Sequence, residues 1–149
     1  MYRHILVPTD GSLVSVRAEK AAIEIAKKFG ARITVAHVMT PYSPRALGEV
    51  RGAGTQPMSK QEYEEVIGKR AKAAASRVVT RARRAKVAAD TVLETDDSPS
   101  DALVRIANLA KCDLIVMGSS SRVGLERIFI GSVASEVLSG TKTPVLVCH

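Results

Sequence analysis

Short apolar runs alternate along this chain with segments in which apolar residues recur every three or four positions. The first run is His4–Val7, and the recurring apolar positions after it reach Phe29, where Gly30 is placed to end a helix. A second run, Ala31–Val38, follows this glycine directly. A strand, a helix and a strand within about 35 residues form a βαβ unit, in which the two strands are parallel.

The same alternation continues through the rest of the chain. A capping box, Ser59 with Glu62, precedes a long helical pattern, and Ser98 with Pro99 precedes a second one. Further strands are expected at Val87–Glu94, Asp113–Met117 and Pro144–Cys148, with a short helix after Gly131. This pattern predicts one α/β domain over residues 1–149, a doubly wound five-stranded parallel sheet with helices on both faces. The segment Met39–Pro57, with three prolines and three glycines, is expected to be a loop.

Composition and charge limit the classes of function. Aromatic residues make up 3% of the chain and hydrophobic residues 46%, which suits a small-aliphatic core of parallel strands. Cys112 and Cys148 show no metal-ligand spacing and are expected to be reduced thiols in a cytoplasmic protein. No stretch approaches the roughly 20 apolar residues that a membrane-spanning helix needs. The net charge of +7 favours anionic ligands, but the basic stretch Arg77–Lys86 lacks interleaved aromatics, so no nucleic-acid partner is expected.

Two loops contain candidate ligand-binding residues. Ligands of doubly wound sheets bind at the carboxyl ends of strands, where the strand order reverses. Pro8–Ser12 follows the first expected strand and Gly118–Val133 follows the fourth, so the two loops meet if these strands are neighbours. Free backbone amides at a helix that starts near Gly131 and Ser132 would bind phosphate, although these two residues are equally typical of a simple helix cap.

Several longer segments make the chain resemble the universal stress protein family. They are HILVPTDGS from His4, DLIVMGS from Asp113, GSVASEVL from Gly131 and TPVLV from Thr143. The resemblance implies a Rossmann-like fold of the adenine nucleotide alpha hydrolase type and a role in stress response or signalling. The nucleotide-binding branch of this family has a motif of Gly, two residues, Gly, nine residues, and Gly-Ser or Gly-Thr. Gly118 and Gly131-Ser132 match its ends, whereas Ser121 replaces its second glycine.

The resemblance also implies a set of site residues. It places Asp10 and its loop near the ribose or a metal ion, Val38 near the adenine, and the glycine motif around the phosphates. The full expected set is Pro8, Thr9, Asp10, Val38, Met117, Gly118, Ser121, Arg122, Gly131, Ser132 and Val133. Asp10 is either a magnesium ligand or a residue that structures its own loop by hydrogen bonding.

The ligand expected from this resemblance is ATP or a related adenine nucleotide, with or without Mg²⁺. No other residue of the motif is placed to activate water, so at most slow hydrolysis is expected. The alternative, favoured by Ser121, is a family member that does not bind nucleotide and acts through protein contacts. The apolar last strand, Pro144–Cys148, would lie at a sheet edge, and in the family this strand pairs across a two-fold axis, which implies a homodimer.

Overall fold

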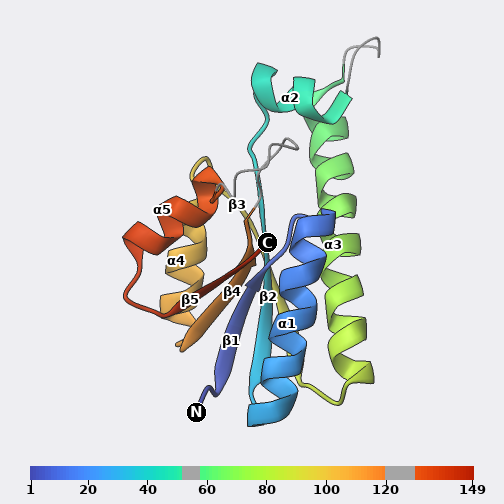
Figure 1. Cartoon of the computed structure of the whole chain (residues 1–149). Helices are drawn as coiled ribbons and strands as arrows, with labels where there is room; N and C mark the ends of the chain where they lie inside the picture. Colours follow the sequence, from blue (N-terminus) through green and yellow to red (C-terminus); the bar gives the residue numbers. More distant parts are fainter. Residues whose placement is uncertain (52–57, 120–129) are drawn as a thin grey trace.

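The computed structural model describes residues 1–51, 58–119 and 130–149. Its strands form one parallel sheet in the order β3-β2-β1-β4-β5 (Figure 1). Their bounds are His4–Pro8 for β1, Arg32–Met39 for β2, Ala89–Thr95 for β3, Leu114–Gly118 for β4 and Val145–Cys148 for β5. Ile5 pairs with Leu114 and with Ile33, so β1 lies between β2 and β4 and the order of the strands reverses beside it.

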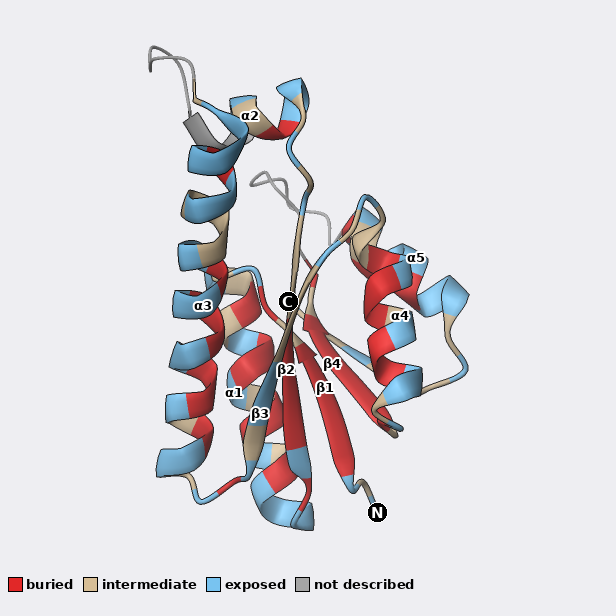
Figure 2. Ribbon diagram, turned by 180° about the vertical axis from the view of Figure 1, so that it is seen from behind, coloured by how far each residue is buried: buried red, intermediate tan, exposed pale blue. Residues whose placement is uncertain are grey.

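Helices cover both faces of the sheet, which confirms the doubly wound fold. They are α1 (Leu13–Phe29), α2 (Pro44–Arg51), α3 (Lys60–Arg84), α4 (Pro99–Leu109) and α5 (Ser132–Gly140). Helices α1 and α3 pack on one face, and α4 and α5 pack on the other (Figure 1). Buried residues lie along the central strands β1, β2 and β4 and on the inward sides of these helices (Figure 2).

The core is aliphatic, as the composition predicts. Ile5, Leu6 and Val7 of β1 are completely buried, because a central parallel strand has helices above and below it. The two cysteines are free thiols; Cys112 is buried and Cys148 half-buried. In the part of the chain that the structure describes, no helix is long and apolar enough to cross a membrane.

The helix ends agree closely with the signals in the sequence. Ser12 begins α1 and its Oγ accepts the N–H of Ser15 at 3.2 Å, while Gly30 ends the helix with φ 68°. The capping box of α3 is complete, since the Ser59 and Glu62 side chains each accept the other residue's N–H. Ser98 caps α4 with Pro99 as the first helical residue. These contacts join residues only three or four positions apart, which is why the sequence alone predicts them.

The expectation of a loop over Met39–Pro57 is wrong in part, because α2 lies within this segment. Ser43 starts the helix by accepting the N–H of Ala46 at 3.1 Å, and Pro44 occupies the first helical position. Two turns are too few to give a readable apolar period, so Pro and Gly dominate the pattern. A smaller difference is that β3 begins at Ala89 rather than Val87, because the Val87 N–H still bonds the Ala82 carbonyl of α3 at 2.9 Å.

Two glycines in open surroundings allow the cost of a left-handed backbone to be measured directly. An added Cβ would meet no atom within 4 Å at Gly30 or at Gly68, but Gly30 has φ 68° whereas Gly68 lies inside α3. We expect Gly30→Ala to lower the free energy of unfolding by about 1 kcal/mol. The matched Gly68→Ala should raise it by about 0.5–1 kcal/mol. Urea denaturation measures both free energies. Equal effects would contradict the conclusion that the left-handed backbone at Gly30 disfavours any residue with a Cβ.

Candidate functional site

A pocket of about 210 Å³ opens at the carboxyl end of the sheet, beside the junction of β1 and β4. Residues from the ends of three strands and from the first turns of three helices line it. They are Pro8, Thr9, Asp10, Ser12, Val14, Ser15, Ala36, Val38, Pro99, Leu103, Met117, Gly118, Val133 and Ala134. The structure therefore brings the Pro8–Ser12 loop together with Gly118 and Val133, the two ends of the second segment on which the sequence hypothesis rests.

Most of the expected site residues lie around this pocket. Seven line it: Pro8, Thr9, Asp10, Val38, Met117, Gly118 and Val133. Gly131 and Ser132 directly precede Val133 at the start of α5 but are not part of the lining. Ser121 and Arg122 lie outside the described residues.

Asp10 structures its own loop. Its Oδ1 accepts the N–H of Ser12 at 2.8 Å, in the Asx-turn geometry that lets a short polar side chain imitate a backbone turn. Burial raises the pKa of Asp10, but hydrogen bonding, chiefly from Ser12, outweighs this and holds the pKa below its ordinary value. The carboxylate is thus ionised at neutral pH. Within residues 1–51, 58–119 and 130–149, no three His, Cys, Asp or Glu side chains cluster around a metal-sized site.

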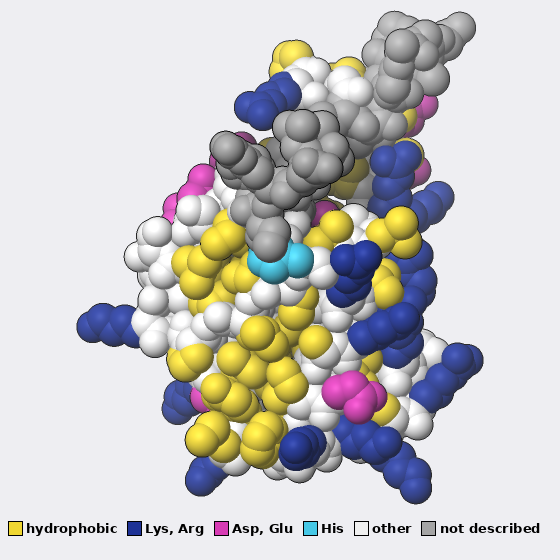
Figure 3. Space-filling model, in the orientation of Figure 1, with side chains coloured by type: hydrophobic (Ala, Val, Ile, Leu, Met, Phe, Trp, Pro, Cys, Tyr) yellow, Lys and Arg dark blue, Asp and Glu magenta, His cyan; other side chains and the backbone are white. Residues whose placement is uncertain are grey.

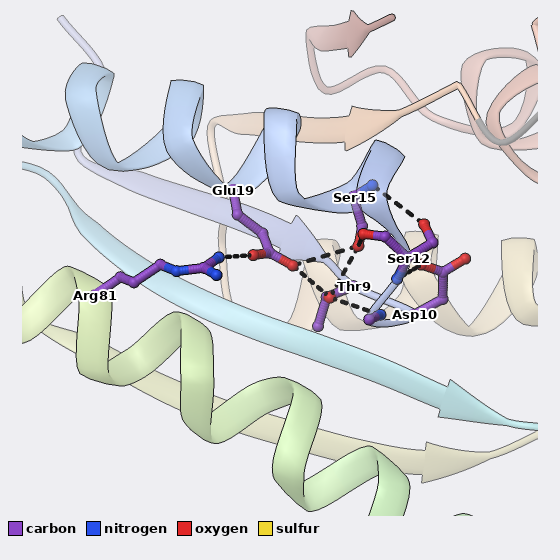
Figure 4. A network of polar contacts seen from close by, with 7 residues as sticks. Thr9, Asp10, Ser12, Ser15, Glu19 and Arg81 are labelled. Atoms are coloured by element: carbon purple, nitrogen blue, oxygen red, sulfur yellow. Dashed lines mark hydrogen bonds and ion pairs between the residues drawn. The ribbon is translucent and has the colours of Figure 1, made fainter.

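Thr9 is held from behind by a buried ionic network that the sequence analysis missed (Figure 4). Its Oγ1 donates to Glu19 Oε1 at 2.7 Å and accepts the N–H of Gly11 at 3.1 Å. Glu19 Oε2 in turn accepts a hydrogen bond from Arg81 Nη1 of α3 at 2.6 Å. The signal in the sequence was a carboxylate between Ala18 and Ala22, inside the apolar stripe of a helix.

Gly118 is required by the packing of α1 against β4. A Cβ at this position would lie 2.9 Å from Val14 Cγ1 and 3.0 Å from both the backbone carbon and the carbonyl oxygen of Val14. The first turn of α1 therefore approaches β4 to a distance that only glycine permits. This contact closes one side of the pocket, since both Val14 and Gly118 line it.

No side chain of the described residues caps the first turn of α5. The N-cap is Gly131, with φ −59° and ψ 157°, and Ser132 is the first helical residue with an exposed side chain. Gly131 is therefore the N-cap residue, and the Ser132 hydroxyl does not cap the helix. The Gly131 angles are open to any residue, so its backbone conformation does not require glycine. Amides at an uncapped helix start are a suitable site for an anion.

The end of β4 is also tied to the end of β5. The N–H of Ser119 donates to the Cys148 carbonyl at 2.8 Å, and the buried Ser119 Oγ forms a hydrogen bond with His149 Nδ1 at 2.7 Å. Ser119 follows Gly118 of the pocket directly, so the pocket and the edge strand share this corner of the sheet.

Comparison with known proteins assigns the family. The family model described as "Universal stress protein family" matches residues 1–149. The chain belongs to the universal stress protein family. A universal stress protein of Methanocaldococcus jannaschii is 36% identical over 149 residues, covering 99% of this chain and 82% of the relative.

Two solved structures of universal stress proteins that hold adenine nucleotides resemble this chain. One, in complex with cAMP, has a TM-score of 0.70 and 31% identity, covering 99% of this chain and 97% of that one. Another, from Archaeoglobus fulgidus in complex with dAMP, has a TM-score of 0.70 and 25% identity, covering 99% and 98%. The resemblance to the family that the sequence segments indicated is thus confirmed.

The contact between Gly118 and α1 generates a stability prediction. Gly118→Ala should lower the free energy of unfolding by about 1–3 kcal/mol, because backbone atoms of Val14 cannot move aside without shifting the helix. Adding Val14→Ala removes only the side-chain part of the clash and should restore only part of the loss. Gly140→Ala is the matched control, since its added Cβ meets Val104 at an ordinary 3.7 Å. Wild-type stability of Gly118→Ala in chemical denaturation would show that α1 does not constrain this position.

Proposed function

We propose that this universal stress protein binds ATP or a related adenine nucleotide in the pocket beside β1 and β4, and acts as a stress-response regulator. The observation that carries the proposal is the convergence of the Pro8–Ser12 loop and the two ends of the Gly118–Val133 segment on one pocket. Universal stress proteins of the same fold that hold cAMP and dAMP support an adenine nucleotide as the ligand.

The chemistry of the pocket suits the parts of such a nucleotide. Val38, Leu103 and Met117 form apolar walls for a flat base, and the Asp10 carboxylate is placed to accept hydrogen bonds from ribose hydroxyls. The uncapped amides at the start of α5 supply donors for phosphate. If Mg²⁺ accompanies the nucleotide, the Asp10 carboxylate would be the described lining residue that holds it.

The lining residues support binding rather than fast catalysis. The described ones include one carboxylate, Asp10, and no histidine, lysine or arginine, while Arg122 of the expected set lies outside the described residues. Phosphoryl transfer and hydrolysis need cationic groups on the phosphates and a group that orients the nucleophile. The second candidate function, a family member that acts through protein contacts without nucleotide, is favoured by one observation, the serine at position 121 in place of the motif glycine.

Calorimetric titration of the purified chain with ATP and AMP tests the proposed function. We expect wild-type protein to bind and Gly131→Val to lose binding, because the branched side chain stands where phosphate must approach the α5 amides. The variant should remain folded, since φ −59° and ψ 157° are open to valine. Leu138→Ala, at an exposed position of the same helix, is the control and should bind normally. If the wild-type protein does not bind nucleotide at millimolar concentration, the nucleotide-binding proposal is wrong. The second candidate function, action through protein contacts, then remains.

We further propose that the chain forms a homodimer through β5. This strand is at one edge of the sheet, and its Leu146 side chain is 40% exposed. Hydrophobic side chains gather on the face of the molecule where β5 lies (Figure 3). An exposed apolar edge strand tends to aggregate by pairing with strands of other chains. In a symmetric dimer, the same strand of a second copy would pair with its backbone and bury its apolar side chains.

The dimer generates its own prediction. Leu146→Asp should convert the protein to a monomer, because a carboxylate buried against a second copy of itself is strongly unfavourable. Leu109→Asp is the control, since Leu109 is 75% exposed and belongs to α4 rather than to β5. Light scattering coupled to size-exclusion chromatography measures the mass. A wild-type monomer, or a dimer that survives Leu146→Asp, would contradict assembly through this strand.

A further inference from the structure

Glu19 is a buried carboxylate that lies behind the pocket without lining it. The residue is 2% exposed and belongs to α1, whose neighbouring buried positions are mainly alanine and isoleucine. Its two oxygens have different partners: Oε1 accepts from Thr9 at 2.7 Å and from Ser15 at 3.4 Å, and Oε2 accepts from Arg81 (Figure 4). The Arg81 side chain is 38% exposed and reaches Glu19 from α3.

The hydrogen bond from Thr9 to Glu19 determines which way the Thr9 hydroxyl is oriented within its loop. A threonine hydroxyl has one hydrogen, and donation of that hydrogen to Glu19 leaves its lone pairs for the N–H of Gly11. Gly11 has φ 78°, the left-handed conformation at which the chain turns between Asp10 and Ser12. Glu19 thus acts on the backbone that presents Asp10, through a single intermediate side chain.

Helix α3 supports the same turn from a second direction. A Cβ added to Gly11 would lie 2.9 Å from Arg77 Nη2 and 3.4 Å from Ala74 Cβ, so the turn packs directly on this helix. Arg77 and Arg81 are four positions apart and project from neighbouring turns of α3. The Pro8–Ser12 loop is therefore positioned by α1 and α3 together.

Stability alone does not account for a carboxylate at position 19. Replacing a buried ion pair by apolar side chains of similar volume is often neutral or favourable. What an apolar side chain cannot do is accept the hydrogen of Thr9 and so orient its hydroxyl toward Gly11. The groups that contact a ligand must be held to within about 0.5 Å of their binding positions. Hydrogen bonds from residues behind them hold them there.

We propose that Glu19, itself held by Arg81, is a positioning residue that sets the Thr9–Gly11 turn for nucleotide binding. This inference rests on the proposed function, since the ligand it serves is the adenine nucleotide of the same pocket. Glu19 makes no ligand contact in this role; it acts through Thr9.

The experiment compares Glu19→Ala, Glu19→Gln and Thr9→Val, with Glu24→Ala at an exposed position of α1 as control. Calorimetry gives the Kd for ATP at a temperature where each variant is folded, and NMR gives the proton exchange rate of the Gly11 amide without nucleotide. Glu19→Ala and Thr9→Val should each weaken ATP binding by about tenfold and speed Gly11 exchange. The double variant with Glu19→Ala and Thr9→Val should bind ATP no more weakly than either single variant, because both substitutions break the same hydrogen bond. Glu19→Gln keeps one acceptor oxygen for Thr9 but loses the ion pair with Arg81, so it should weaken ATP binding less than Glu19→Ala does.

The outcomes separate this inference from the proposed function. If wild-type protein binds no ATP, the proposed function fails and the Gly11 exchange rates alone decide whether Glu19 positions the turn. A folded Glu19→Ala variant with wild-type Kd overturns the inference, whether or not its melting temperature falls. If Glu19→Ala does not fold, Thr9→Val decides, and wild-type ATP affinity in that variant overturns the inference.

Discussion

The pairing of β1 with β2 on one side and β4 on the other is the constraint on which the rest of the structure depends. Because all three strands run parallel, their carboxyl ends meet at one edge, and every loop that leaves this edge starts within reach of the others. The pocket is a direct product of this pairing. Asp10 follows β1, Gly118 ends β4 and Val38 is near the end of β2, and all three line the same space.

The hydrogen bonds around the pocket divide into two kinds. Contacts on the pocket side, such as Asp10 with the Ser12 amide, are local and define the shape of one turn. Contacts behind the pocket, such as Glu19 with Arg81, join elements far apart in the chain and fix where that turn lies. In the proposed function, a nucleotide would contact the first kind directly and would depend on the second kind for the position of the turn. The separation explains how most of the lining comes from short side chains and backbone, while the charged groups behind it belong to α1 and α3.

How far the sequence predicts this structure follows from the range of each interaction. Ser59, Glu62 and Gly30 act on residues within four positions, so the ends of α1 and α3 are readable from the sequence. The pairing of β1 with β4 depends on tertiary contacts. The sequence could therefore predict only that the two loops meet if these strands are neighbours. The link between Thr9, Glu19 and Arg81 is tertiary too, and no periodic pattern contains it. Helix α2 was missed because two turns beginning at Pro44 give no apolar period.

The link between Glu19 and Arg81 spans 62 positions in the chain, and this separation has a consequence for the order of folding. Strands β1 and β2 with α1 form a local βαβ unit that can assemble early, because its contacts are close in sequence. The Thr9–Gly11 turn nevertheless lacks its contacts with Arg77 and, through Glu19, with Arg81 until α3 docks. A chain emerging from the ribosome therefore contains the residues of this turn long before it can hold them in place. We therefore expect the pocket to form late in folding, after both ends of this link have been synthesised and α3 has packed on the sheet.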